Sequence, residues 1–146
     1  MRRLNPTDIA RLLPHSGNMV LLDAVLEYDA HTIHCLAHRH HAVDNPLRID
    51  GRLPAWCGME YAAQAMAIHQ GLCAGEAAPS ARGFLAVARD VVLMQAELDS
   101  LPGELHIHAE IIMAEGGRSL YRFHLTSQGQ TLLSGRVVVV LQGAPA

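Results

Sequence analysis

One carboxylate and one amide interrupt the most apolar segment of the chain, DGRLPAWCGMEYAAQAMA at positions 50–67. Glu60 and Gln64 are four residues apart, so a helix would place them on the same face, one turn from each other. A carboxyl group in apolar surroundings favours its neutral form, and a neutral carboxyl can act as a general acid near neutral pH. The segment therefore predicts a buried acid at Glu60 that is held in position by Gln64.

Gly58 and Trp56, which precede Glu60, could also contribute to a substrate-binding site. Gly58 has no side chain to block a substrate carbonyl that approaches its N–H, and Trp56 can either line an acyl tunnel or anchor the loop. A purely structural explanation stays open, in which Glu60 and Gln64 form a satisfied polar contact at a subunit interface. That explanation needs a named partner, because an isolated ionised carboxylate costs several kcal/mol to bury.

Three elements are predicted before this segment. The Asn-Pro-Thr sequence at 5–7 is typical of a helix cap, and Pro14 ends the short helix that follows it. Residues 19–29 and 31–40 predict a β-hairpin. Residues 43–54, with two prolines and one glycine, predict a loop.

A long helix is predicted from Pro54, which suits the first helical position because its missing N–H costs nothing there. The apolar run continues through Ile68, and Gly71 or Gly75 would end it. Alanines recur along the run, and no face of it is consistently polar. Because a helix that is apolar on all sides is a buried helix, we expect this one at the centre of the fold.

Four further strands are predicted after a loop at 75–81, and they span residues 83–98, 104–115, 119–128 and 131–142. Their separators, LPG, GG and QG, are typical of hairpin turns. The order of elements predicts an α+β architecture, the hotdog fold, in which an antiparallel sheet wraps around one long central helix as a single domain over residues 1–146. Such a sheet leaves strand edges open for pairing, so we expect a dimer.

Composition narrows the possible functions. The chain has 146 residues, of which 50% are hydrophobic and 17% charged, as in a globular domain with its own core. Its 11 Lys and Arg are scattered and its net charge is −3, so we expect no nucleic-acid partner. No apolar run is long enough to span a membrane, and no signal peptide is predicted. Three cysteines without metal-ligand spacing indicate free thiols and a cytoplasmic protein.

Four short segments resemble the hotdog 3-hydroxyacyl-ACP dehydratases of fatty acid synthesis. They are LLPHSGNMVLLDAVLEYD (12–29), NPLRIDGRLP (45–54), EYAAQA (60–65) and LPGELHI (101–107). The resemblance implies that water is removed from a 3-hydroxyacyl thioester, which requires one group to take the α-proton and another to protonate the leaving hydroxyl. It assigns Glu60 to the acidic residue on the central helix, which works with a histidine of the other subunit. It also implies an acyl carrier protein or acyl-CoA as partner, and no metal or redox cofactor.

The chain departs from that family at the histidine. The catalytic histidine of the dehydratases falls at Arg52, and the stretch between Pro54 and Glu60 is several residues shorter. Both features are similar to the dehydratase-like proteins of aryl polyene pigment clusters, which are thought to pair with a His-bearing dehydratase subunit. Because a guanidinium stays protonated in proteins, Arg52 cannot be the base. We therefore expect a heterodimer in which the partner's histidine faces Glu60 and Arg52 faces the partner's acid.

Two other functions stay open on this sequence. A hotdog thioesterase would hydrolyse acyl-CoA or acyl-ACP with Glu60 alone as base or nucleophile. A non-catalytic chain would only complete and stabilise a dehydratase. The two functions can be distinguished with the isolated chain, because only a thioesterase would hydrolyse a thioester without a partner.

Ten histidines raise the question of a metal site. His106 and His108 alternate along a predicted strand and so share one face. No acidic or third histidine ligand lies at a telling distance in the sequence, so we predict no metal site. The HRHH run at 38–41 is interpreted as a solvated turn, with one alternative: a histidine of this run enters the active site in place of the missing one.

Overall fold

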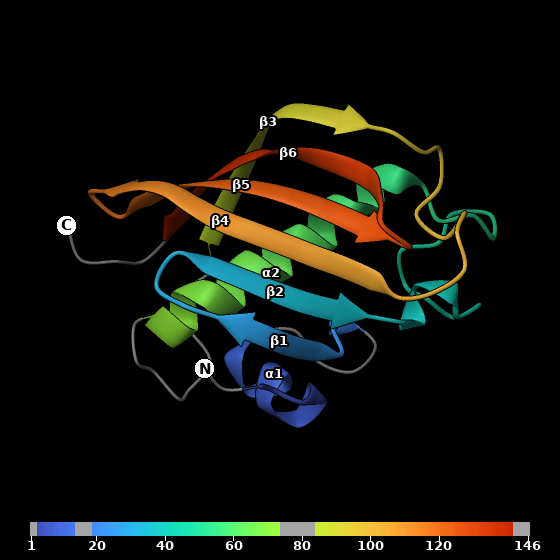
Figure 1. Cartoon of the computed structure of the whole chain (residues 1–146), viewed down its shortest axis with the longest axis horizontal. Helices are drawn as coiled ribbons and strands as arrows, with labels where there is room; N and C mark the ends of the chain where they lie inside the picture. Colours follow the sequence, from blue (N-terminus) through green and yellow to red (C-terminus); the bar gives the residue numbers. More distant parts are fainter. Residues whose placement is uncertain (1–2, 14–18, 74–83, 142–146) are drawn as a thin grey trace.

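The computed structural model describes residues 3–13, 19–73 and 84–141. Six strands form one antiparallel sheet in the order β1-β2-β4-β5-β6-β3, which curves around helix α2 (Figure 1). The elements in chain order are α1 (Pro6–Leu12), β1 (Ala24–Tyr28), β2 (Thr32–Ala37), η2 (Arg39–His41), η3 (Ala55–Cys57), α2 (Gly58–Cys73), β3 (Phe84–Leu93), β4 (Leu105–Glu115), β5 (Arg118–Ser127) and β6 (Gln130–Leu141). The elements η2 and η3 are single 3-10 turns.

Two tight turns fix the register of the three central long strands. Gly116 and Gly117 both have positive φ between β4 and β5, as do Gln128 and Gly129 between β5 and β6. Two successive residues with positive φ are typical of the type I′ turn, whose twist matches that of the flanking strands. The GG and QG separators therefore make the hairpins that the sequence predicts.

The N-terminal segment covers part of one edge of the sheet. The Asn5 side chain accepts a hydrogen bond from the Asp8 N–H at 2.9 Å, and the Asp8 carboxylate accepts one from the Asn5 N–H at 3.2 Å. This reciprocal capping box begins α1. Just before it, Leu4 and Val25 of β1 exchange two backbone hydrogen bonds, of 3.0 and 3.1 Å. The edge at β1 is thus partly closed, whereas β3 forms the other edge.

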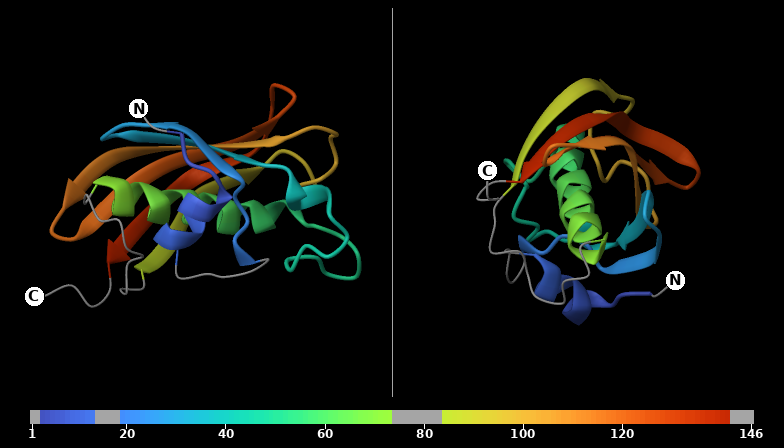
Figure 2. Two further views of the ribbon diagram at one scale, coloured as in Figure 1. Left: turned by 90° about the horizontal axis from the view of Figure 1, so that it is seen from below. Right: turned by 90° about the vertical axis from the view of Figure 1, so that its left-hand side faces the viewer.

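The core fills the space between the sheet and α2, which the end-on view in Figure 2 shows inside the curve of the strands. Alternate strand residues point inward because successive side chains of a strand face opposite sides. The buried residues that make this core include Ile33, Cys35, Tyr61, Ala65, Ile68, Ile107, Tyr121, Phe123 and Leu125. The outward positions between them on β2 and β4, among them His34 and His106, are only partly covered.

A buried polar network ties the C-terminal half of α2 to the sheet. His69 Nε2 lies 2.9 Å from the carbonyl oxygen of Asp29, and His69 Nδ1 lies 2.6 Å from the Tyr121 hydroxyl. A carbonyl only accepts, so Nε2 carries the proton and Nδ1 accepts from Tyr121. The Gln70 amide donates to the same hydroxyl oxygen at 2.9 Å. Burial lowers the pKa of His69, in agreement with the neutral ring that this network requires.

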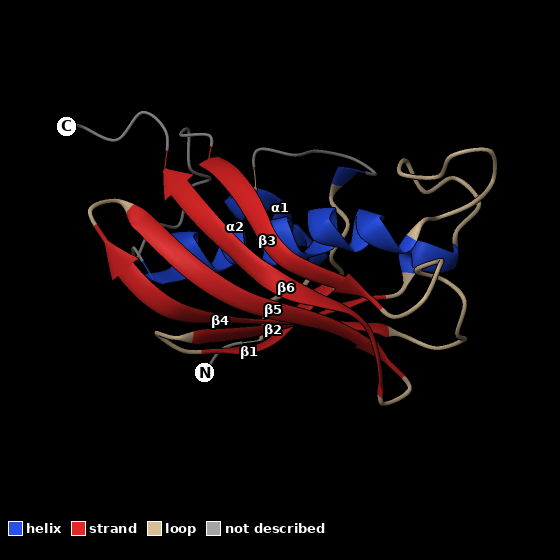
Figure 3. Ribbon diagram, turned by 90° about the horizontal axis from the view of Figure 1, so that it is seen from above, coloured by secondary structure: helices blue, strands red, loops and turns tan. Residues whose placement is uncertain are grey.

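The predicted architecture is confirmed: an antiparallel sheet, one long helix and a short N-terminal helix (Figure 3). Several limits differ from the prediction. The strand expected over 19–29 begins at Ala24, and the strand expected over 83–98 ends at Leu93. Pro54 precedes a 3-10 turn, and α2 begins only at Gly58. The loop expected at 75–81 lies outside the described residues. Within the described ranges, no helix has both the length and the apolar character needed to cross a membrane.

Candidate active site at the start of the central helix

Glu60 lies on a face of α2 that the chain itself leaves open. Glu60 is exposed, and Met59, Ala63 and Ala67 are only partly buried. Their spacing of three to four residues makes them one continuous stripe of the helix. The prediction that Glu60 is buried, in a helix covered on every side, is therefore wrong for the single chain. The prediction assumed that a helix with apolar residues on every side is buried on every side. Alanine, however, also occurs on helix faces that are left uncovered.

Gln64, one turn after Glu60, is buried and holds the chain before β1. Its Oε1 accepts from the Leu21 N–H at 2.9 Å, and its Nε2 donates to the Met19 carbonyl at 2.7 Å. The side chain is 2% exposed. The prediction that this amide orients the Glu60 carboxyl is corrected accordingly: both ends of the amide bond to backbone groups of the chain at 19–21.

Gly58 brings the first turn of α2 into close contact with the sheet. A Cβ at this position would lie 2.7 Å from Leu133 Cδ2 and 3.0 Å from Leu125 Cδ2. A side chain at this position would force the buried leucines to shift, so packing favours glycine here, and the substrate-binding role predicted for it stays a prediction. Trp56 lies four residues before Glu60, in the 3-10 turn, and is 53% exposed. Its predicted contact with an acyl chain and the approach of a carbonyl to Gly58 stay predictions.

Arg52 is paired within its own chain. Its Nη2 and Nε donate to Glu97 Oε1 at 3.0 and 3.3 Å, and its side chain is 69% exposed. Asp50 and Gly51, both with positive φ, form a tight turn before it. Nothing in the spacing of positions 52 and 97 relates them, so the sequence does not predict the pairing of Arg52 with Glu97. An exposed pair of this kind contributes about 0–1 kcal/mol to stability, so Arg52 is held in place only weakly.

Backbone hydrogen bonds fix the segment that leads into α2. The Leu98 N–H donates to the Leu53 carbonyl at 2.8 Å, and the Ala55 N–H donates to the Ala96 carbonyl at 3.0 Å. The loop before this segment is joined to α2 as well, because the Asn45 amide donates to the Tyr61 hydroxyl at 3.0 Å. The start of the helix, with its exposed carboxylate, is therefore presented by a rigid support, as a catalytic group requires.

The edge strand β3 is apolar and exposed over most of its length. Its exposed residues include Val87, Val91, Val92 and Leu93, and Met94 follows directly. Among the described strands β3 pairs with β6 on one side. Arg89 and Asp90 interrupt this apolar series, and Asp90 pairs with Arg136 of β6. An exposed edge strand with apolar side chains is a template for pairing with another chain.

The histidines at 38–41 do not supply the missing base to their own chain. No hydrogen bond or ion pair of the described residues joins His38, His40 or His41 to Glu60. His38 lies 3.6 Å from the Asp23 carboxylate, and His41 lies 3.2 Å from the Gly103 carbonyl. His40 is fully buried, and its two ring nitrogens have no hydrogen-bond partner among the described residues.

The buried His40 makes the stability of the protein depend on pH. Burial lowers its pKa from 6.5 to about 4. The folded chain thus binds this proton less readily than the unfolded chain, so the stabilising contribution is complete above about pH 6.5 and is lost as pH falls toward 4. We expect the free energy of unfolding in urea to fall between pH 7 and pH 4.5. His40→Leu should reduce that fall, and an equal fall in both proteins would contradict this role of His40.

Comparisons with known proteins place this geometry in a family. Residues 7–144 match the family described as ApeP-like, the ApeP dehydratases. A search of curated proteins gave no match. Among solved structures, the chain is similar to one described as the dehydratase heterocomplex ApeI:P from Xenorhabdus doucetiae, with a TM-score of 0.80 and 24% identity over 94% of this chain and 92% of that chain.

Two thioesterase structures share the fold at lower similarity. A mutant thioesterase from Pseudomonas aeruginosa has a TM-score of 0.52 and 15% identity over 80% of each chain. A hypothetical thioesterase from Streptococcus pneumoniae, solved with coenzyme A, has a TM-score of 0.59 and 11% identity over 84% of this chain and 87% of that chain. These likenesses establish the hotdog fold, and the family match extends over almost the whole sequence. The chain therefore belongs to the ApeP-like dehydratase family.

Proposed function

We propose that this chain is the carboxylate-bearing subunit of a heterodimeric dehydratase. Its substrate is a 3-hydroxyacyl chain held as a thioester on an acyl carrier protein or on coenzyme A, and its partner is a second hotdog subunit that carries the catalytic histidine. The observation that carries the proposal is the exposed position of Glu60 on an open helix face, in a chain that has Arg52 where the dehydratases have their histidine. Family membership and the heterocomplex among the similar structures support the same assignment.

The reaction needs two proton transfers. One group removes the proton from the α-carbon, and another protonates the β-hydroxyl as the C–O bond breaks, which releases water and leaves a conjugated double bond. The partner's histidine and Glu60 divide these tasks. Arg52 cannot take either of them, because its guanidinium stays protonated. No metal or redox cofactor is needed for this elimination.

The start of α2 supplies the electrostatic part of the site. Removal of the α-proton places negative charge on the thioester oxygen. The Gly58 N–H already donates within the 3-10 turn, to the carbonyl of Ala55, so we assign the stabilisation of such charge to the positive end of the helix dipole. A second subunit on the open face would exclude water from Glu60, which strengthens these interactions. The same subunit would offer an acid with which Arg52 can pair in place of Glu97.

Mixing the two subunits tests the proposal. We expect the isolated chain to dehydrate a 3-hydroxyacyl carrier-protein substrate only at background rate, and the mixture with a His-bearing hotdog dehydratase subunit to show turnover. The assay follows the absorbance of the conjugated product, with each subunit alone as control. Full activity of the isolated chain would contradict the pairing.

A thioesterase function is the second candidate. The exposed carboxylate of Glu60 at the helix start supports it, since an accessible carboxylate can activate water without a partner, and hotdog thioesterases are among the similar structures. Release of free thiol from acyl-CoA or acyl carrier protein by the isolated chain would favour hydrolysis over dehydration. A thiol-reactive dye added to the isolated chain and the thioester substrate would detect this release.

A further inference from the structure

Four histidines lie together on the outer face of the sheet: three are side by side on neighbouring strands, and the fourth lies next to them. His34 of β2 lies directly opposite His108 of β4, which lies opposite His124 of β5. His106 precedes His108 by two residues and therefore points to the same side. The strand positions between them, Ile33, Cys35 and Ile107, are buried against α2, so the histidines face away from the helix and from Glu60.

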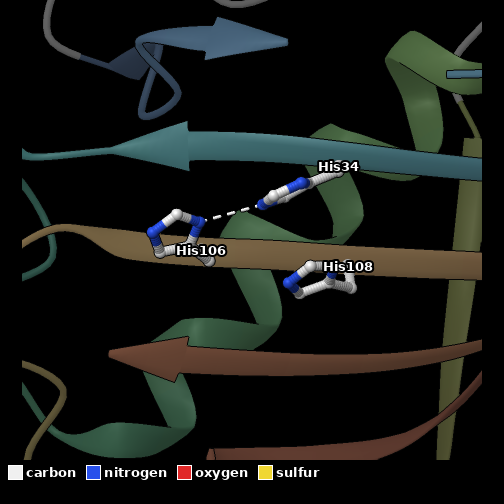
Figure 4. A group of neighbouring side chains, drawn as sticks. All are labelled: His34, His106 and His108. Carbon is white, nitrogen blue, oxygen red and sulfur yellow. Dashed lines mark hydrogen bonds between the residues drawn. The ribbon is translucent and has the colours of Figure 1, made fainter. Parts of the chain in front are cut away.

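Three of these rings approach one another closely (Figure 4). His34 Nε2 lies 2.9 Å from His106 Nδ1, and one ring nitrogen each of His34, His106 and His108 lies within 4.8 Å of the other two. The His34 and His108 rings are stacked, with centroids 4.1 Å apart. All three residues are partly buried, so water reaches the group but does not surround it.

The three rings meet the chemical requirements of metal ligands. Imidazole nitrogen binds a metal only in its neutral form. The hydrogen bond between His34 and His106 requires one ring to accept, and hence to carry a free lone pair.

We propose that His34, His106 and His108 form a binding site for one divalent transition-metal ion, with zinc as the best-suited ion. Three imidazoles and one position open to water are a typical zinc set, and imidazole ligands also suit Cu²⁺ and Ni²⁺. Glu27 lies opposite His34 on β1 and lines the same hollow of the sheet as His34 and His108. This site is independent of the proposed dehydratase function.

Small movements of the rings complete the coordination. Zn–N bonds of about 2.0–2.1 Å with tetrahedral angles place ligand nitrogens roughly 3.3 Å apart. The His34 and His106 nitrogens are already 2.9 Å apart. The ligand nitrogen of His108 lies within 4.8 Å of the other two, so it would move inward when an ion binds.

The bound ion would join two strands that are distant in sequence. His34 belongs to β2, and His106 and His108 belong to β4, so the ion cross-links the β1–β2 hairpin to the long hairpins that follow α2. An ion that binds only the folded chain raises its stability in proportion to the logarithm of its concentration. The ion would thus stabilise the folded chain from the face of the sheet opposite the proposed reaction centre.

Zinc titration of the full chain, purified without a histidine tag and freed of metal by a chelator, tests the site. We expect calorimetry to give one Zn²⁺ per chain, and the Tm to rise with zinc. His34→Gln and His108→Gln should each weaken binding at least tenfold and remove the rise in Tm. His31→Gln is the matched control, because His31 is exposed in the turn before β2 and outside the group.

The controls distinguish this site from unspecific binding to ten histidines. Circular dichroism of each variant without metal shows whether the sheet is intact, and His106→Gln provides a third, independent variant. Equal binding by the three cluster variants and the wild type would overturn the proposal. An equal loss in His31→Gln would overturn it as well, as would a stoichiometry of several weakly bound ions that no single substitution changes.

Discussion

Glu60→Gln should lower the turnover of the assembled dehydratase by roughly 100- to 10,000-fold, the range that a lost general acid or base produces. Glutamine keeps the size and polarity of the side chain but can neither take nor give the proton. Because Glu60 is exposed on the open face of α2, the substitution removes no buried contact, and the chain should fold normally. The measurement is kcat of the mixed subunits on a 3-hydroxyacyl carrier-protein substrate.

A matched control separates chemistry from assembly. Glu115→Gln changes another exposed carboxylate, at the end of β4, and should leave kcat unchanged. Size-exclusion chromatography should show both variants in complex with the partner. If the Glu60→Gln complex turned over at the wild-type rate, the chain would be a non-catalytic partner that only supports the other subunit, and the proposed proton transfer would be refuted.

The sequence predicted the fold well where local chemistry determines structure. The GG and QG pairs predicted the turns at 116–117 and 128–129, because few other residues adopt two successive positive φ angles. The Asn5 cap predicted the start of α1 for a similarly local reason. Periodicity then placed β4, β5 and β6 within a few residues of their observed limits.

The sequence failed where contacts depend on register across the sheet. His34 and His106 are separated by 72 positions and meet only because β2 pairs with β4, so the histidine pattern in β4 looked incomplete. The amide of Gln64 was assigned to Glu60, its neighbour on the helix, but it bonds to the chain at 19–21. Hydrophobic composition also hid the open face of α2, since alanine is common in both buried and uncovered stripes.

Replacing Val87 and Val92 on β3 by lysine should separate this chain from its partner. The two side chains are 48% and 52% exposed, so the changes should cost the isolated chain little. Covering such a valine in an interface contributes about 1–3 kcal/mol, and lysine instead places a charge on the edge strand, a device by which proteins prevent edge pairing. Each lost 1.4 kcal/mol weakens association about tenfold.

The assembly and the activity should therefore fail together in the Val87→Lys, Val92→Lys double variant. On size-exclusion chromatography its subunits should elute separately, and turnover of the mixture should drop to that of the separate chains. Ile112→Lys is the control, because Ile112 is 44% exposed on β4, which is an interior strand of the sheet. Co-elution and normal turnover of the double variant would show that the open edge of β3 is not the subunit interface. The partner would then have to reach Glu60 across the open face of α2 alone.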